Sequence, residues 1–336
     1  MAGETTGLSD ETSMPGMAPL FEYKSVQPLF LAGPTAAGKS EVALRLGEML
    51  GGEIISVDSM QVYRGLDIGT AKPTPADRQR VPHHLIDVVD LTESFDAARF
   101  VQLARRGVDE IRGRGRTPIF CGGTGLYFKA FLEGLGTAPV ADPQLRAQLE
   151  ATPIQTLLAE LEQRDPITFE RIDRRNPRRV IRALEVIRQT GHPFSEQRAT
   201  WSPAAASLPP SSLTLFWGLQ RAPEDLLRRI NARVEKMFER GLVKETELLL
   251  EAGLERNRSA LQALGYRQVV EHLRGERSLA EIIALVKLRT RQYAKRQMTW
   301  FRRQARVEWF ALSEDTSPEK IARQIATAYK VRNIEY

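Results

Sequence analysis

The feature that most constrains this chain is a glycine-rich segment at residues 33–40, with the sequence GPTAAGKS. It follows the apolar residues 29–32 and precedes a helical pattern over residues 41–50, the strand–loop–helix context that the motif G-x-x-x-x-G-K-[ST] requires. Glycines accept backbone angles that other residues resist, so successive N–H groups can turn inward around an anion. The N-terminus of the following helix adds its dipole there. The segment therefore predicts a phosphate-binding loop in an α/β fold.

Each loop residue type suits a diphosphate or triphosphate. Lys39 supplies a point charge for a terminal phosphate, and Ser40 offers a hydroxyl to Mg²⁺, which is the predicted cofactor. The alternative is a glycine-rich turn whose lysine faces solvent, and both flanks argue against it. The predicted phosphate-binding residues are Gly33, Pro34, Thr35, Ala36, Ala37, Gly38, Lys39 and Ser40.

Composition narrows the class of protein. The 336 residues suffice for one or two domains with a sizeable core. No apolar run has membrane-spanning length, and residues 1–24 resemble neither a signal nor a transit peptide, so we expect a disordered N-terminal tail there. Cys121 is the only cysteine, which excludes an intrachain disulfide and favours the cytoplasm.

Basic residues are concentrated in two segments. The net charge is +6, and residues 171–182 hold six arginines against one acid, while residues 278–306 hold eight Lys and Arg against one acid. Such runs suit a polyanionic partner, but they also occur on ordinary solvated faces. Charge alone leaves both interpretations open.

Strand and helix patterns alternate through the first part of the chain. Strands are predicted at residues 53–57, 85–89 and 117–121, and helices at 96–112 and 126–132, which indicates a parallel sheet flanked by helices. From the cap Asp142-Pro143 to about residue 199 the pattern is helical, and the β-rich residues 213–219 then return to the sheet. The predicted division is a tail at 1–24, a P-loop α/β core at 25–137, an all-helical insertion at 138–204, a mostly helical second part of the core at 205–313 and a C-terminal helix or tail at 314–336.

The longest predicted helix spans residues 278–304 and starts at a capping box formed by Ser278 and Glu281. A last edge strand is expected at 307–310. Spacing along the helix places one group in the core and another on the opposite, exposed side. The core group is Ile282, Val286, Tyr293 and Trp300, and the exposed group is Lys287, Arg291, Lys295 and Arg302.

A phosphate-binding loop most often belongs to an enzyme that hydrolyses or transfers phosphate from ATP or GTP. Such an enzyme needs a second acid at the end of a buried strand to hold Mg²⁺. The strand at 117–121 ends instead in Cys-Gly-Gly-Thr, and the nearest acid is Asp58, which closes the strand at 53–57 and is expected to face the phosphate-binding loop. Asp58 could be a metal-shell residue or a general base. The nucleotide-dependent kinase or ATPase stays an alternative.

Seven segments in order resemble the tRNA dimethylallyltransferase (tRNA isopentenylpyrophosphate transferase) family, over about residues 28–310. They are residues 33–40, 58–63, 69–73, 82–87, 122–127, 178–185 and 290–297. The resemblance implies that the loop holds dimethylallyl diphosphate rather than a nucleoside triphosphate. It also implies transfer of the dimethylallyl group to N6 of the tRNA adenosine immediately 3′ of the anticodon.

Roles follow from the resemblance. Asp58 matches the general base, while Thr35, Lys39 and Ser40 act on the leaving diphosphate. The helical insertion clamps the anticodon stem-loop, and Gln61 suits an adenine edge. The implied tRNA contacts are Asp58, Ser59, Met60, Gln61, Thr124, Arg146, Arg178, Arg179, Val180, Ile181 and Arg182, with Arg267 as a less specific one. Arg291, Lys295 and Arg296 match a further family segment and could serve either tRNA or the diphosphate.

Several alternatives are open on sequence. A non-catalytic RNA-binding protein would keep the basic segments without using Lys39, and a related adenylate isopentenyltransferase would use adenosine monophosphate in place of tRNA. His83 and His84 point to opposite faces of a strand, so we expect satisfied histidines rather than a metal site. Cys121 is expected at a buried strand end and not as a nucleophile. We expect a monomer.

Overall fold

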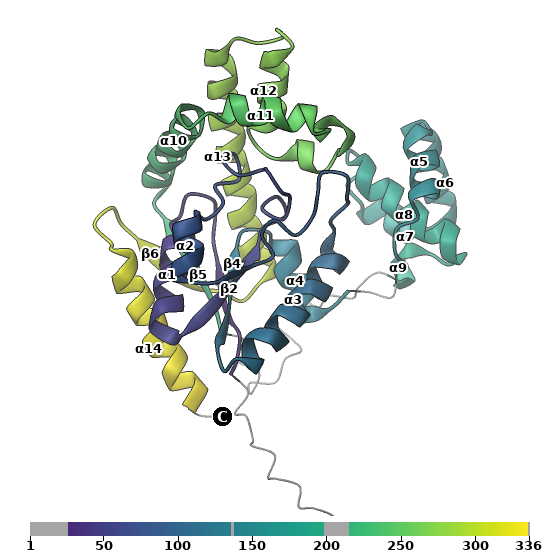
Figure 1. Ribbon diagram of the computed structural model, residues 1–336. Coiled ribbons are helices and arrows are strands. Elements are labelled where there is room, and N and C mark those ends of the chain that lie inside the picture. Colours follow the sequence, from purple (N-terminus) through teal and green to yellow (C-terminus); the bar gives the residue numbers. More distant parts are fainter. Residues whose placement is uncertain (1–25, 136–137, 198–214, 335–336) are drawn as a thin grey trace, which may run out of the picture.

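The computed structural model describes residues 26–135, 138–197 and 215–334 (Figure 1). Six parallel strands form one sheet in the order β3-β2-β4-β1-β5-β6. The strands are β1 (Leu29–Ala32), β2 (Gly52–Val57), β3 (His83–His84), β4 (Thr117–Gly122), β5 (Phe216–Arg221) and β6 (Glu308–Leu312). The predicted P-loop α/β architecture is confirmed, including the return of the chain to the sheet after the insertion and the last edge strand.

Both faces of the sheet are covered because the strand residues alternate between two apolar cores. Leu29 and Leu31 pack with α1 (Lys39–Leu50) and α14 (Pro318–Ile334) on one face. Phe30 and Ala32 pack on the other face with α3 (Ala97–Gly113), α4 (Gly125–Glu133) and Phe301 of α13 (Leu279–Gln304). Helix α14, which follows the second part of the core in the predicted division, thus completes one layer of the core.

The strand order places the loops that follow β1, β2 and β4 at one edge of the sheet. Ala32 at the end of β1 pairs with Gly122 of β4 on one side and Gly218 of β5 on the other, and Val57 of β2 pairs with Gly122 in turn. The loops that leave β1 and its neighbours turn to opposite sides, because later strands are added on both sides of β1. This arrangement leaves a crevice at the carboxyl ends of these strands. The segments that start at residues 33, 58 and 123 therefore lie beside one another.

The insertion forms a lobe of helices at the right of Figure 1. It contains α5 (Pro143–Ala151), α6 (Ile154–Arg164), α7 (Pro166–Arg171), α8 (Pro177–Thr190) and α9 (Phe194–Gln197). Asp142 caps α5 by accepting hydrogen bonds from the amides of Gln144 and Leu145, as its position before Pro143 predicts. The lobe has its own core, made of Leu149, Leu157, Leu161, Val180, Ile181, Ala183, Leu184 and Ile187.

The remaining helices gather beyond the carboxyl edge of the sheet, at the top of Figure 1. They are α10 (Pro223–Glu239), α11 (Leu242–Glu251), η1 (Leu254–Arg256), η2 (Ala260–Gln262), α12 (Tyr266–Leu273) and most of α13; a short α2 (Pro75–Arg80) precedes β3. Ser278 and Glu281 form the predicted capping box at the start of α13. None of the described helices is long and apolar enough to cross a membrane.

Two local predictions were wrong. Residues 85–89 do not form a strand, since β3 ends at His84 and both Leu85 and Asp87 have positive φ angles, 61° and 56°. This turn brings the Asp87 carboxylate to the buried ammonium of Lys72 at 2.5 Å, a partner that a buried charge needs. The expected tail at residues 1–24 and the expected strand start at 213–214 lie outside the described residues.

The second error concerns α13. Ile282 and Val286 are buried as predicted, but Tyr293 and Trp300 are only half-buried. The buried positions toward the end of the helix are Thr290, Ala294, Gln297 and Phe301. Here the helix meets polar loops at the sheet edge rather than an apolar surface, so a polar residue occupies a buried position.

Candidate active site

The phosphate-binding loop takes the conformation that its glycines allow. Gly33 has φ 150°, and a Cβ at this position would lie 2.6 Å from the Leu219 carbonyl oxygen, so no larger residue fits. Gly38 has φ 101° and caps α1. Lys39 bends back so that Nζ donates to the Pro34 carbonyl oxygen at 2.8 Å, and burial lowers the pKa of its ammonium to about 8. This loop conformation suits an anion.

A cavity of about 800 Å³ lies at the carboxyl edge of the sheet. It brings together the predicted residues that follow β1 and β2 with the end of β4. The residues are Thr35, Ala36, Gly38, Lys39 and Ser40 after β1, Asp58, Ser59, Met60 and Gln61 after β2, and Cys121, Gly122 and Gly123 at the end of β4. Gly33, Pro34 and Ala37 shape the loop without lining this cavity. Thr124 stands just behind it, where Oγ1 accepts a hydrogen bond from the Ser59 amide at 3.3 Å.

Asp58 is held by the turn that follows it. Its Oδ1 accepts hydrogen bonds from the amides of Met60 (2.8 Å) and Gln61 (3.3 Å), which orients the carboxylate at the cavity wall. The Gln61 amide is engaged within the protein: Oε1 accepts from Ser56 Oγ at 2.9 Å and Nε2 donates to the Thr70 carbonyl at 3.2 Å. Gln61 therefore holds the segment 58–61 against the loop at residues 70–71.

Sequence reasoning missed the cations that α10 adds to the cavity. Arg229 Nε donates to the Ala36 carbonyl at 2.9 Å, and Arg233 Nη2 donates to the Thr70 carbonyl at 3.4 Å. Both line the cavity together with Lys236, and Arg221 of β5 donates from Nε to the Ala37 carbonyl at 2.9 Å. Residues 229, 233 and 236 share one face of a helix, and this spacing is the signal that could have revealed them.

The cavity also has an apolar wall, which sequence reasoning did not assign. Met60 follows β2, Val234 and Met237 come from α10, Val286 from α13, and Leu264 from the turn before α12. Cationic loop and apolar wall share one space, so the cavity suits a ligand with a charged end and a hydrocarbon end.

The thiol and the two histidines behave as structural groups. Cys121 lies at the end of β4, and burial raises the pKa of its thiol to about 11, which keeps it protonated at neutral pH. His83 Nδ1 lies 2.7 Å from the Val81 carbonyl, and His84 Nε2 lies 2.6 Å from Glu53 Oε2. Each histidine thus has its own partner, as expected from their opposite directions.

The arginines of the insertion divide into two kinds. Arg146 and Arg182 both reach Oε2 of the fully buried Glu185, at 3.2 and 2.8 Å. Arg178 and Arg179 are exposed on α8, whereas Val180 and Ile181, which follow them, are buried in the core of the lobe. The side chains of those two apolar residues therefore anchor α8, and the exposed cations are the groups that face outward.

A second cavity of about 680 Å³, called here the basic groove, lies between α8 and α13. It is lined by Arg179, Gln292, Lys295, Arg296, Thr299, Trp300, Arg303 and Gln304. Arg296 lines both the basic groove and the first cavity, and its guanidinium lies 5.9 Å from the centre of the Tyr293 ring. Arg267 and Arg291 line neither; Arg267 pairs with Glu271 at 3.7 Å, and Arg291 Nε donates to the Lys287 carbonyl at 3.4 Å.

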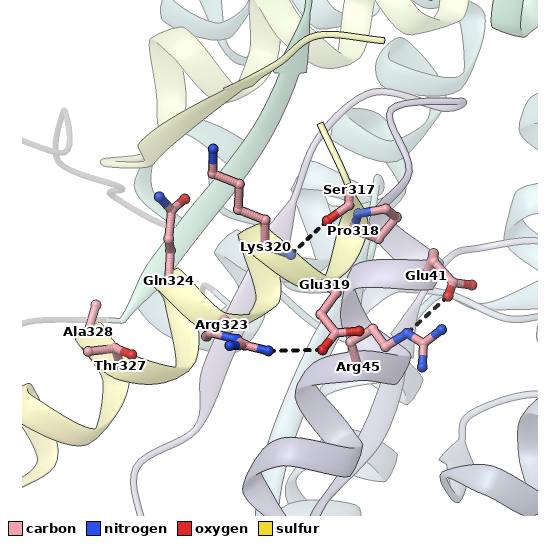
Figure 2. Close-up of a pocket in the computed structure, with 10 residues that line it drawn as sticks. All are labelled: Glu41, Arg45, Ser317, Pro318, Glu319, Lys320, Arg323, Gln324, Thr327 and Ala328. Atoms are coloured by element: carbon pink, nitrogen blue, oxygen red, sulfur yellow. Dashed lines mark hydrogen bonds and ion pairs between the residues drawn. The ribbon is translucent and has the colours of Figure 1, made fainter. Parts of the chain in front are cut away.

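A larger cavity of about 950 Å³ lies between α1 and α14 (Figure 2). Its carboxylates face arginines, with Arg45 Nε 3.3 Å from Glu41 and Arg323 Nη2 3.1 Å from Glu319. These charges neutralise each other, whereas the cations of the first cavity bond mainly to main-chain carbonyls. By volume alone the α1–α14 cavity would be the better candidate for the ligand site, but its charges are paired. The cavity beside the phosphate-binding loop is therefore the better candidate for binding an anionic ligand.

Comparison with known proteins identifies the family. The family model for IPP transferase matches residues 61–304. A tRNA dimethylallyltransferase 1 from Citrifermentans bemidjiense is 46% identical over 286 residues, which cover 85% of this chain and 92% of that protein. The chain belongs to the tRNA dimethylallyltransferase family. A second member, from Trichlorobacter lovleyi, is also 46% identical over 86% of this chain and 95% of its own length.

Solved structures of this family have the same fold. The full-length tRNA isopentenylpyrophosphate transferase of Bacillus halodurans matches with a TM-score of 0.66 and 39% identity over 92% of this chain and 98% of that one. A eukaryotic dimethylallyltransferase described as acting on tRNA matches with a TM-score of 0.73 and 27% identity over 93% of this chain and 80% of that one. The family expected from the seven ordered segments is confirmed.

Proposed function

We propose that this chain transfers the dimethylallyl group of dimethylallyl diphosphate to N6 of tRNA adenosine-37, 3′-adjacent to the anticodon, and releases diphosphate. The observation that carries this proposal is the single cavity in which a phosphate-binding loop, a carboxylate and an apolar wall meet. Relatives named for this activity align over most of the chain. Different residues of this cavity are proposed for each end of the reaction.

At the donor end, charge develops on the oxygen that leaves with the diphosphate. Thr35, Lys39 and Ser40 with the loop amides, and Arg229 and Arg233 from α10, surround the space where this charge forms. Preorganised donors at such a position commonly contribute about 2.7–4 kcal/mol each to lowering the barrier. The hydrocarbon end lies against the apolar wall, away from water.

The Ser40 hydroxyl fits the predicted Mg²⁺. It lies in the first turn of α1 and lines the cavity. Among the described residues no group of three His, Cys, Asp or Glu side chains could hold a metal ion, so the diphosphate oxygens would complete the shell. A bound Mg²⁺ would neutralise part of the diphosphate charge.

At the acceptor end, Asp58 works on the adenine amino group. As the bond from N6 to the allylic carbon forms, the carbon–oxygen bond breaks, its electron pair leaves with diphosphate, and the N6 proton passes to the Asp58 carboxylate. The turn that holds Oδ1 leaves Oδ2 without a hydrogen bond from the described residues, so it is available to receive the proton.

Access of tRNA follows from the adjacency of the two cavities. The target base must leave its stack to reach the catalytic cavity. The basic groove offers Arg179, Lys295 and Arg303 to phosphates, and Arg296 borders both spaces. We propose that the insertion holds the anticodon stem-loop over this groove, with Arg146, Arg178, Arg182, Arg267 and Arg291 as further candidates for contact with the RNA.

The decisive experiment incubates unmodified tRNA with the protein, Mg²⁺ and dimethylallyl diphosphate, and analyses the nucleosides by mass spectrometry. We expect an adenosine heavier by one dimethylallyl group, formed by the wild type and lost with Asp58→Asn. Asp90→Asn is the matched control, since this exposed carboxylate pairs with Arg64 away from the cavity.

Parallel reactions separate the alternatives. Phosphate released from ATP without any prenylated nucleoside would return the chain to the nucleotide-dependent enzymes. An adduct on adenosine monophosphate but not on tRNA would make it an adenylate isopentenyltransferase. Binding of tRNA that is indifferent to Lys39→Ala, without turnover, would indicate an RNA-binding protein. We further propose a monomer, because one chain supplies every group named above, and a cytoplasmic location, because Cys121 is the only cysteine of the sequence.

A further inference from the structure

The side chain of Gln297 on α13 joins the two loops that border the catalytic cavity. Its Oε1 accepts a hydrogen bond from the Thr35 amide at 2.8 Å, and its Nε2 donates to the Gly123 carbonyl at 3.0 Å. The residue is only 7% exposed. One planar amide thus bonds the phosphate-binding loop after β1 to the loop after β4, with its acceptor on one side and its donor on the other.

The surroundings leave no room for a different arrangement. A Cβ at Gly123 would lie 2.1 Å from Gln297 Nε2, and a Cβ at Gly125 would lie 2.1 Å from the Trp300 ring one turn further along α13. Because Gly123 and Gly125 have no side chains, α13 can pack closely against this loop. Larger residues at either position would displace the helix from the loop.

Hydrogen bonds continue from this point to the proposed base. The amides of Gly123 and Thr124 both donate to the Val57 carbonyl at 3.2 Å, immediately before Asp58. Thr124 Oγ1 then accepts from the Ser59 amide, immediately after Asp58. An unbroken series of contacts thus runs from Thr35 through Gln297 to both sides of Asp58.

We infer that Gln297 is a positioning residue that sets the separation between the diphosphate loop and Asp58. The inference rests on the proposed function, because these two sites hold the leaving group and the proton acceptor of one displacement. Such reactions depend on alignment, and a displacement of about 1 Å can lower the rate about a hundredfold. Because the exposed side of the same helix carries Lys295 and Arg303, RNA that binds in the basic groove contacts the helix that fixes this separation.

The test compares two variants of similar size. Gln297→Met removes both hydrogen bonds, and Gln297→Glu keeps an acceptor for the Thr35 amide while its carboxylate can no longer donate to Gly123. We expect kcat to fall about a hundredfold in Gln297→Met and about tenfold in Gln297→Glu, with KM for dimethylallyl diphosphate and Kd for tRNA changed less than threefold. Gln324→Met on α14, exposed on the other side of the sheet, should leave all three values unchanged.

The outcomes are separable. Rates are normalised to folded protein from thermal unfolding of each variant, and Gln297→Glu keeps the test valid if Gln297→Met does not fold. Unchanged kcat, or a loss that lies in KM or Kd, would overturn the positioning role. Absence of transfer by the wild type would instead refute the proposed function, and an active wild type with equally active variants would refute only this inference.

Discussion

In the α/β core, Lys39 and Arg229 donate hydrogen bonds to main-chain carbonyls, whereas in the insertion Arg146 and Arg182 converge on the buried carboxylate of Glu185. A carbonyl orients a cation without cancelling its charge, and a carboxylate cancels much of it. The cations of the core thus stay available to an anionic ligand. Arg146 and Arg182 also join α5 to α8 through Glu185, whereas Arg178 and Arg179 are exposed and keep their full charge for RNA.

Arg188 and Arg179 illustrate the distinction on one helix. Arg188 lies 2.5 Å from Glu160 and joins α8 to α6, while Arg179 lines the basic groove. Arg182, one of the six arginines of residues 171–182, is likewise engaged by Glu185, so the number of basic residues in that segment overstates the charge available to RNA. Ion-pair partners, rather than the number of basic residues, decide which cations serve binding.

The largest expected effect is in the core. Arg233→Met should lower kcat/KM about a hundredfold to a thousandfold, because its guanidinium lines the cavity and no other described group takes its position. Steady-state kinetics with dimethylallyl diphosphate and tRNA measure this loss. Arg240→Met, exposed at the end of the same helix, is the control. Equal activity of both variants would place the leaving diphosphate elsewhere.

A smaller effect is expected from the central carboxylate of the insertion. Glu185→Gln leaves Arg146 and Arg182 without their anionic partner, and we expect the lobe to lose about 1–3 kcal/mol of its free energy of unfolding. The two arginines are 40% and 30% exposed, so water compensates part of the loss. Hydrogen exchange of α5 and α8 measures the change. Unaltered protection of both helices would contradict a structural role for this cluster.

Exposed and paired arginines should differ in tRNA binding. Arg179→Ala should weaken binding and reduce the slope of log Kd against log salt by about one, because it removes one phosphate contact. Arg188→Ala should leave the slope unchanged, since Glu160 already neutralises that charge. Titrations at several salt concentrations test the pair. Identical slopes for the two variants would remove the distinction between the two kinds of arginine.

The smallest effect concerns the thiol near Lys39. Burial raises the pKa of Cys121 to about 11 even though the ammonium of Lys39 acts to lower it. We expect slow alkylation at pH 7.5 and a rate that increases about tenfold per pH unit until the pH approaches 11, as the thiolate fraction grows. Mass spectrometry of the intact protein follows the reaction. A rate that does not change with pH would show that access, and not ionisation, controls the thiol.

Local patterns predicted the elements whose ends carry their own signals. The motif at residues 33–40 fixed β1, its loop and α1 together, and the caps at Asp142 and Ser278 marked where α5 and α13 begin. The order of apolar strands predicted that Asp58 would lie beside the loop, because parallel strands end at a common edge. These features depend on short stretches of chain.

Features that depend on tertiary contacts were not predicted. Residues 85–89 are apolar enough for a strand, but they form a turn in which Asp87 pairs with the buried ammonium of Lys72. This long-range ion pair cannot be read from the local pattern. Arg229 and Arg233 belong to a helix whose cationic face has meaning only once α10 lies over the sheet edge. Likewise, Gln297 looks like one polar residue in a basic helix until the loops of β1 and β4 meet it.

The position of β1 between β4 and β5 has a consequence for biosynthesis. Residues 33–215 separate the end of β1 from the beginning of β5, and the whole insertion lies within that interval. As the chain leaves the ribosome, β1 can pair with β4 before β5 has been synthesised. Until β5 is available, the other edge of β1 has unpaired main-chain hydrogen-bonding groups. The insertion, whose contacts are close in sequence, can fold before β5 is synthesised. Completion of the sheet, and with it of the catalytic cavity, is therefore a late step in the synthesis of this protein.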